Sequence, residues 1–271
     1  MQFSPSALLA PYIKNYTLVT IDQDIDNEVF YPSGYIDLVI RISGTAATVI
    51  NGNRQDTPAI ELLGHLTLPS RVAATKGTVV LIARIYPYAG ALFFPHPVSE
   101  FTNYATNLND VSAVAGTELY SRLMEAGTIA QKISVLEGYL LQRLTQHEKQ
   151  LKKVTLVQQL SHELLNGYPD VDLPALAGSS GLSARYIQKL YLTNMGISPV
   201  AFVAVVRFNR SLRLVLDTPA SLTAIAYECG YYDQAHFIRE FRKFTGITPS
   251  DARHSLTKNG EAYQQAVNIG F

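Results

Sequence analysis

The first hundred residues alternate short apolar runs with turn-forming residues. Four runs rich in β-branched and aromatic residues predict strands: YTLVTI (16–21), YIDLVIRI (35–42), ATVI (47–50) and TVVLIARIY (78–86). PSG at 32–34 and NGN at 51–53 lie between them and favour turns. Several short strands at this spacing predict a β-sandwich or β-barrel over residues 1–110.

From Val111 onward the apolar positions follow a helical period. Residues 112–127 and 129–150 carry apolar side chains three and four positions apart, which predicts two helices. The second helix has one apolar stripe, formed by Ile129, Ile133, Leu136, Leu140 and Leu144. The stripe packs either against the β domain or against a second copy of the chain, so residues 111–150 are predicted to be a helical linker or a dimerisation region.

Residues 151–256 are predicted to be entirely helical, and they contain one stretch twice. ALAGSSGLSARYIQKLYLTNMGISP (175–199) matches AIAYECGYYDQAHFIREFRKFTGITP (224–249) at nine positions, after one residue is inserted in the second copy. A chance match of that extent is rare, so the two copies predict one structural unit used twice. Together with the β-rich region, this predicts an α+β protein that ends in an all-α domain.

Each copy has the signals of a short helix, a tight turn and a second helix. Gly181 and Gly230 supply the positive φ that the turn needs. Ser183 and Asp233 follow as N-caps of the second helices. A longer helix with Pro199 at its first position connects the copies. This is the layout of two helix-turn-helix units, in which the second helix enters the major groove of DNA.

Helical geometry divides the second helix of each copy into a buried side and an outer side. The buried sides are apolar and consist of Ile187, Leu190 and Tyr191 in the first copy and of Phe237, Phe241 and Phe244 in the second. The outer sides consist of Ala184, Arg185, Gln188 and Lys189, and of Gln234, Ala235, Ile238, Arg239 and Arg242. Arginine, lysine and glutamine side chains can form paired hydrogen bonds with guanine or adenine edges, so these sides predict contact with bases.

Further polar side chains near these helices are predicted to contact DNA phosphates. They are Ser183, Arg207, His236, Arg242 and Lys243. For His236, simple packing is an equal alternative. Two ordinary helical hairpins with solvated polar faces are the other interpretation of the repeat, but two copies in register favour the DNA-binding one.

Residues 152–253 resemble the DNA-binding domain of AraC/XylS-type transcription regulators, most specifically in IAYECGYYDQAHFIREFRKFTGITPSDAR (225–253). The resemblance implies a bacterial protein that binds an asymmetric site through two adjacent major grooves. It places the base-reading roles on Arg185, Gln188, Lys189, Gln234, Ile238 and Arg239. Ala235 stands where many relatives carry a longer polar side chain, so we expect fewer contacts from the second copy.

Residues 1 to about 110 resemble an uncharacterised sensor domain that often precedes such regulators. The resemblance rests on LAPYIKNY (9–16), YPSGYIDLVIRI (31–42) and YPYAGALFF (86–94), and it implies a cupin-like β-barrel. Because the mouths of barrels are favoured ligand sites, four tyrosines are candidates for an effector pocket: Tyr31, Tyr35, Tyr86 and Tyr88. The alternative for these aromatic side chains is ordinary core packing.

Catalytic and metal chemistry finds little support in the sequence. Cupin barrels often hold iron or manganese through histidines, yet the β-rich region has only His65 and His96 and no His-x-His pair. The common phosphate-loop, nucleophile-elbow and zinc-protease motifs are missing. We therefore expect no metal, no cofactor and no enzymatic activity. Two alternatives stay open: a metal-dependent cupin-type enzyme with an accessory DNA-binding module, and a ligand-free regulator controlled by protein contacts.

Composition fits an intracellular globular protein of about two domains. The chain is 47% apolar and 16% charged, and its formal net charge is zero. Residues 1–150 carry 10 basic and 13 acidic side chains, whereas residues 151–271 carry 12 and 9, a shift too mild to indicate DNA binding by itself. The single cysteine, Cys229, excludes an intrachain disulfide.

The N-terminus lacks a secretory signal and no apolar run is long enough to span a membrane, so a cytoplasmic location without membrane contact is expected. The predicted partners are double-stranded DNA and a small effector. RNA polymerase and a second copy of the chain are further candidates. Residues 257–271 form a tail without a recognisable motif.

Overall fold

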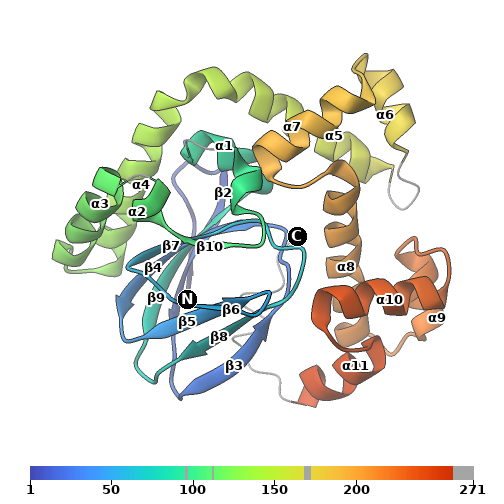
Figure 1. Cartoon of the computed structure of the whole chain (residues 1–271), viewed down its shortest axis with the longest axis horizontal. Helices are drawn as coiled ribbons and strands as arrows, with labels where there is room; N and C mark the ends of the chain where they lie inside the picture. The colour runs from blue at the N-terminus through green and yellow to red at the C-terminus, as the bar shows by residue number, and fades with distance from the viewer. Residues whose placement is uncertain (95–96, 112, 168–171, 259–271) are drawn as a thin grey trace.

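The computed structural model describes residues 1–94, 97–111, 113–167 and 172–258. Two antiparallel sheets pack face to face in the N-terminal part, and the helical C-terminal part lies beside them (Figure 1). The predicted α+β class is confirmed. The described strands form two open sheets and not one closed barrel, so of the two predicted forms the sandwich is the correct one.

The larger sheet has six strands, in the order β1 (Gln2–Phe3), β2 (Ile13–Thr20), β9 (Val79–Ile85), β4 (Ile36–Ser43), β7 (Ile60–Leu63) and β10 (Ala105–Asn107). The smaller sheet has four, in the order β3 (Ile25–Phe30), β8 (Ser70–Ala74), β5 (Ala46–Ile50) and β6 (Asn53–Asp56). The turn between β5 and β6 is the predicted one at Asn51 and Gly52, whose φ values of 51° and 79° suit a tight hairpin.

The larger sheet is covered on both faces. Along each of its strands, successive side chains point to opposite faces of the sheet. In β4, Leu38 and Ile40 face the helices, whereas Asp37 and Val39 face the smaller sheet. Helices α3 (Ala113–Glu125) and α4 (Ile129–Gln146) cover the first face. Leu136 and Leu140 of the α4 stripe are fully buried there, so this stripe packs against the chain's own core.

Four short helical segments lie against α5 or α7 and link the two parts of the molecule: η1 (Pro87–Ala89), α1 (Gly90–Phe93), η2 (Val98–Phe101) and η3 (Glu148–Gln150). Helix α2 (Leu108–Val111) follows β10 and packs on α3. The C-terminal part contains α5 (Leu151–Asn166), α6 (Leu173–Ser180), α7 (Ala184–Met195), α8 (Pro199–Asp217), α9 (Leu222–Glu228), α10 (Gln234–Thr245) and α11 (Pro249–Lys258). Within the described ranges no single helix is long and apolar enough to cross a membrane; the angled pair α7 and α8 meets those criteria only when its members are taken together.

The hydrophobic core continues from the β domain into the C-terminal helices. One cluster joins the outer face of the larger sheet, α1 and α5 to Ile187, Leu190 and Tyr191 of α7. A second cluster holds α8, α9 and α10 together and includes Tyr31 from the β domain. Packing therefore ties both helical units to the sandwich, while the domain limits at residues 110 and 150 stay predictions.

Candidate functional site

The two copies of the repeat fold into matching helix-turn-helix units. In the first, the Asp172 carboxylate caps α6 by accepting from Ala175 N at 3.1 Å, and Gly181 turns the chain with a φ of 67°. In the second, Ser221 caps α9, and Gly230 also has a φ of 67°. Tyr231 and Tyr232 separate Gly230 from the next cap, Asp233, whereas only Leu182 separates Gly181 from Ser183. The extra residue of the second copy is thus absorbed in the turn.

The second helix of each unit begins at the predicted cap. Ser183 Oγ accepts from Tyr186 N at 3.2 Å at the start of α7. Asp233 Oδ1 accepts from His236 N at 2.6 Å at the start of α10. Because the caps are local, they fix where each helix starts and hence which side chains face outward.

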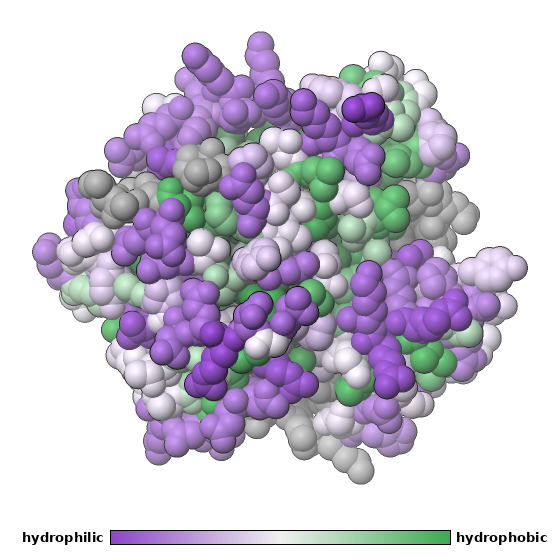
Figure 2. Space-filling model, in the orientation of Figure 1, coloured by the Kyte–Doolittle hydropathy of each residue, from purple (hydrophilic) through white to green (hydrophobic). Residues whose placement is uncertain are grey.

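The predicted buried and outer sides are both observed. Ile187 and Tyr191 of α7 and Phe237 and Phe241 of α10 are all fully buried. The outer side of α7 exposes Arg185, Gln188 and Lys189. On α10, Arg239 and Arg242 are exposed, while Gln234 and Ile238 are half-buried. Hydrophilic side chains gather over α10 in the space-filling view (Figure 2).

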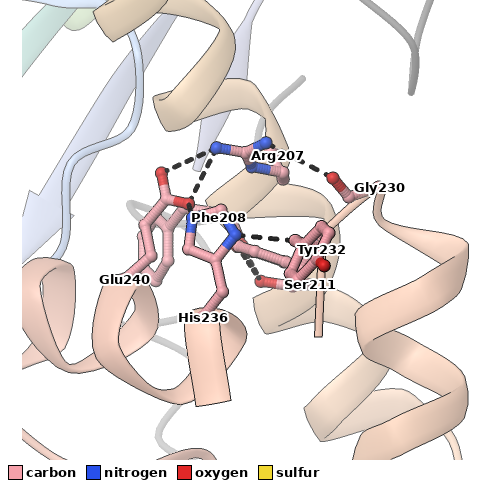
Figure 3. Close-up of polar contacts among 8 residues, drawn as sticks. Arg207, Phe208, Ser211, Gly230, Tyr232, His236 and Glu240 are labelled. Carbon is pink, nitrogen blue, oxygen red and sulfur yellow. Dashed lines mark hydrogen bonds and ion pairs between the residues drawn. The ribbon is translucent and has the colours of Figure 1, made fainter. Parts of the chain in front are cut away.

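Arg207 of α8 fixes the second unit internally, and the prediction that it contacts a DNA phosphate needs correction. Its Nη2 lies 2.8 and 3.1 Å from the two carboxylate oxygens of Glu240 on α10, and its Nη1 donates to Gly230 O at 3.4 Å (Figure 3). The guanidinium also stacks 4.8 Å from the Tyr231 ring. Only 19% of the side chain is exposed and Glu240 pairs its charge, so the structure favours an internal role for Arg207 over a phosphate contact.

His236 belongs to the same cluster. Its Nδ1 accepts from Tyr232 N at 3.4 Å, and its Nε2 lies 3.4 Å from Glu240 Oε2 (Figure 3). Its ring meets the Tyr231 ring edge-on at 5.4 Å. Of the two interpretations for this histidine, the structure favours packing. Arg242 and Lys243 are exposed, and with Ser183 they stay predicted phosphate contacts.

Several contacts join the sandwich to the helical units. The Tyr31 ring packs edge-on against Phe208 of α8 at 6.4 Å. Asn209 Nδ2 of α8 donates a hydrogen bond to Pro32 O at 3.0 Å. It also donates to Val205 O, one turn earlier in α8. At the first unit, Thr102 Oγ1 donates to Gly196 O at 2.7 Å. The sandwich thus touches both the end of α7 and the middle of α8.

Substituting Gly196 tests the contact at α7. Gly196 and its repeat partner Gly246 have φ values of 83° and 81°, so alanine strains the backbone equally at both. An added Cβ at Gly196 would lie 2.6 Å from Thr102 Oγ1 and 3.0 Å from Val98 O, whereas at Gly246 it meets nothing within 4 Å. In urea unfolding, Gly196→Ala is expected to cost about 1–3 kcal/mol more than Gly246→Ala. Equal costs would show that the sandwich does not press on this turn.

Three of the four tyrosines predicted to line a pocket lie together, and the fourth packs against α8. Tyr86 stacks on Tyr88 at 5.4 Å and lies 5.8 Å from Tyr35. The Tyr88 hydroxyl donates to Pro11 O and accepts from Gln158 Nε2. Tyr31 lies apart, 6% exposed against α8. All four rings thus make packing contacts, and burial raises the pKa of Tyr31 to about 12, while a role in a ligand pocket stays a prediction.

A hollow lies instead between the two sheets. This inter-sheet cavity has a volume of about 80 Å³ and is lined by strands of both sheets. Glu61 of β7 lies in its wall and is only 2% exposed. One carboxylate oxygen, Oε2, accepts from Thr48 Oγ1 at 3.3 Å, while Oε1 has no hydrogen-bond partner among the described residues. Burial raises the pKa of Glu61 to about 7, and the Thr48 hydroxyl offsets part of that rise.

The raised pKa of Glu61 predicts a pH-dependent stability. Unfolding restores an ordinary pKa near 4.5, so the wild type loses stability relative to Glu61→Gln as pH rises from about 4.5 to 7 and loses no more above that. At 1.36 kcal/mol per pH unit, glutamine is expected to gain about 3 kcal/mol relative to the wild type across this window. Urea unfolding of both proteins at pH 4.5 and pH 8 measures it. A difference that does not change with pH would contradict a buried ionisable Glu61.

The candidate metal ligands do not come together in the described part of the chain. Within it, no three His, Cys, Asp or Glu side chains lie together as metal ligands would. His65 is fully buried, its Nδ1 is 3.2 Å from Leu66 O, and burial lowers its pKa to about 4. His96, the other candidate ligand, lies outside the described residues. Cys229 is fully buried in the second cluster, as expected for a small apolar side chain.

Two functional candidates escaped prediction from the sequence. The sequence does contain a signal for Glu61, because it is an acidic residue inside the apolar run IELL, and a strand with that pattern buries its carboxylate. Asn209 gave no signal, since its partner Pro32 lies 177 residues away.

Comparison with known proteins agrees with the geometry of the repeated units. A family model described as a helix-turn-helix domain matches residues 176–255, and one described as a domain of unknown function (DUF6597) matches residues 1–107. The virulence regulon transcriptional activator VirF of Yersinia enterocolitica is 35% identical over 86 residues, which cover 32% of this chain and 31% of VirF. The transcriptional activator RhaS of Escherichia coli is 31% identical over 84 residues, or 31% of this chain and 30% of RhaS.

Among solved structures, a probable AraC family transcriptional regulator from Rhodopseudomonas palustris is 32% identical, with 36% of this chain and 94% of that chain covered and a TM-score of 0.34. The chain thus matches less than a third of the length of the two curated relatives. Its C-terminal region is a double helix-turn-helix domain. Residues 176–255 thus match an AraC-type helix-turn-helix domain, and residues 1–107 match a separate family without an assigned function.

Proposed function

We propose that the chain is a sequence-specific DNA-binding transcription regulator whose helices α7 and α10 enter adjacent major grooves. The observation that carries this proposal is the repetition of one capped unit, with an exposed basic outer side, at both ends of α8 (Figure 1). Helix α8 has 19 residues and spans about 28 Å at 1.5 Å per residue. That length suits two helices one turn of DNA apart, about 34 Å.

Base contacts from α7 would come from Arg185, Gln188 and Lys189, all of which are exposed. Arginine and lysine favour guanine, and glutamine favours adenine. The first unit thereby supplies three side chains able to distinguish bases.

The contacts of α10 are fewer. Arg239 is exposed, and half-buried Ile238 suits a thymine methyl group. Gln234 Oε1 accepts from Thr223 Oγ1 at 2.7 Å, which leaves its amide N–H groups for a base acceptor. Ala235 is exposed but has no polar group. We infer that the first unit contributes more of the sequence preference than the second.

Control by a small effector in the sandwich is part of the proposal. The sandwich contacts both units directly, through Tyr31–Phe208, Pro32–Asn209 and Thr102–Gly196. A change at this interface would alter the spacing or orientation of α7 and α10. RNA polymerase, a homodimer and a cytoplasmic location remain predictions, and the proposed function requires no catalytic step.

Selection of genomic fragments by the purified chain tests the proposal, followed by titration of a selected site at 50–200 mM salt. Outer-side cations that neutralise about four or five phosphates give a slope of about −4 in a plot of log affinity against log salt. The measurement should also show tighter binding to the selected site than to random DNA of equal length. A slope near zero, or equal affinity for both DNAs, would contradict the proposed function.

A further inference from the structure

The inter-sheet cavity has the features of a ligand site beside a surface groove. Its walls come from both sheets and are lined mainly by apolar and hydroxyl side chains, among them Val39, Leu63, Val72, Ile82, Thr48 and Ser70. Ala46, Thr57 and Ala74 line both this cavity and an open groove of about 410 Å³ on the surface of the smaller sheet. The shared residues place the groove directly beside the cavity.

Glu61 is the unmatched group in this cavity. Its Oε1 is buried without a hydrogen-bond partner in the described chain, which is costly for a carboxylate. The neighbouring arginines, Arg84 and Arg41, form hydrogen bonds with groups other than Glu61. Arg84 binds Asp37 in a bidentate pair at 3.0 and 3.1 Å, and Arg41 donates to Thr57 O and Gly44 O. A buried acceptor without a donor, in a hollow beside a surface groove, points to a donor that arrives with a ligand.

We propose that the inter-sheet cavity binds the ammonium head of a small primary amine, with Glu61 as its counter-ion. The head donates to Glu61 Oε1, and the Thr48 and Ser70 hydroxyls in the wall can accept its remaining hydrogens. A carboxylate ligand is disfavoured because it would bring a second negative charge beside Glu61.

The volume limits the size of the buried head. An apolar cavity of about 150 Å³ holds benzene, so about 80 Å³ admits roughly half as many heavy atoms, an ammonium with two or three carbons. Any longer part would pass Ala46 and Ala74 into the groove. Asp24, Asp26 and Asp56 line that groove together with Arg41 and Arg54, so it suits a polar tail.

The cavity is connected to the DNA-binding domain by three consecutive residues. Phe30 lines the cavity, Tyr31 packs on Phe208 of α8, and Pro32 O accepts from Asn209 of α8. A ligand that moves Phe30 would therefore shift the contacts of the helix that joins the two units. This effector role rests on the proposed function, whereas the binding site does not.

Thermal unfolding and calorimetric titration of the full chain at pH 8 with methyl-, ethyl-, n-propyl- and n-butylammonium chloride test the site. Sodium chloride matches ionic strength, and sodium acetate and 1-propanol are the chemical controls. We expect a saturable rise in Tm with ethyl- or n-propylammonium and none with acetate or 1-propanol. Glu61→Gln should weaken amine binding at least tenfold, while Glu118→Gln, at an exposed carboxylate of α3, should leave it unchanged.

A second variant, Ala46→Val, narrows the passage and leaves Glu61 in place, so it should weaken n-butylammonium more than methylammonium. The absence of saturable binding by every amine, or equal binding by the wild type and Glu61→Gln, would overturn the site. DNA affinity is measured separately with and without the bound amine. Loss of DNA binding with amine binding intact would contradict only the proposed function, and unchanged DNA affinity on amine binding would overturn only the effector role.

Discussion

Replacing both Lys189 and Arg239 with alanine is expected to weaken sequence-specific DNA binding strongly. Both side chains are exposed on the outer sides of α7 and α10, and within the described residues neither makes a hydrogen bond or an ion pair. Each paired contact to a base contributes about 1–3 kcal/mol. Because the two positions lie in different units, the losses should add, giving about 2–6 kcal/mol or a weakening of roughly 30-fold to 10⁴-fold.

Titration of a selected DNA site by gel shift or fluorescence anisotropy measures this loss. The matched control is Lys76→Ala with Arg122→Ala, which removes two exposed cations from the sandwich and from α3 and should change affinity little. Each single variant should also relax the preference at one base position. An equal loss on selected and random DNA would show that these side chains meet only phosphates.

Phe208→Ala is expected to cause the largest loss of stability. The Phe208 ring is fully buried and lies 4.8 Å from the Phe244 ring, 5.6 Å from the Phe241 ring and 6.4 Å from the Tyr31 ring. Truncation leaves a cavity where α8, α10 and the sandwich meet. Buried Phe→Ala changes typically cost about 3–5 kcal/mol.

Urea unfolding followed by circular dichroism gives the loss for Phe208→Ala. The control is Val200→Ala on the same helix, which is 68% exposed and should change stability by less than about 0.5 kcal/mol. A loss below about 1 kcal/mol for Phe208→Ala would mean that the second unit does not depend on this ring. Because α10 packs on the same ring, DNA binding should weaken with the stability.

The helical domain was predictable because its signals are local. Caps, turn glycines and apolar periods act within a few residues. Ser183, Gly181 and Ile187 therefore predict the first unit without knowledge of any tertiary contact. Because the unit is duplicated, each of these signals occurs in both copies and supports the same prediction. The outer sides of α7 and α10 follow directly from helical geometry once the starts are known.

The sandwich was only partly predictable. Strands β3 and β6 carry charged and polar residues because one side faces solvent, so their patterns resemble loops. The choice between sandwich and barrel depends on whether the sheet edges close, which no local pattern determines.

The roles of Arg207 and Tyr31 depend on distant partners. Arg207 pairs with Glu240, 33 residues away, and Tyr31 packs on Phe208 of the other part of the molecule. From the sequence, Arg207 was predicted to contact a phosphate because it is a basic residue near a DNA-binding helix. Tyr31 was predicted to line a pocket because it is a tyrosine in a β domain. The tertiary contacts gave both of them structural roles.

Hydroxyl-radical footprinting of the chain on a selected site tests most directly that the two units occupy successive major grooves. The geometry predicts two protected tracts on one face of the DNA, with centres about 10 base pairs apart. Inserting five base pairs between the half-sites should abolish the joint footprint, because the second groove then faces away from α10. A single protected tract, or a footprint that survives the insertion unchanged, would contradict the account.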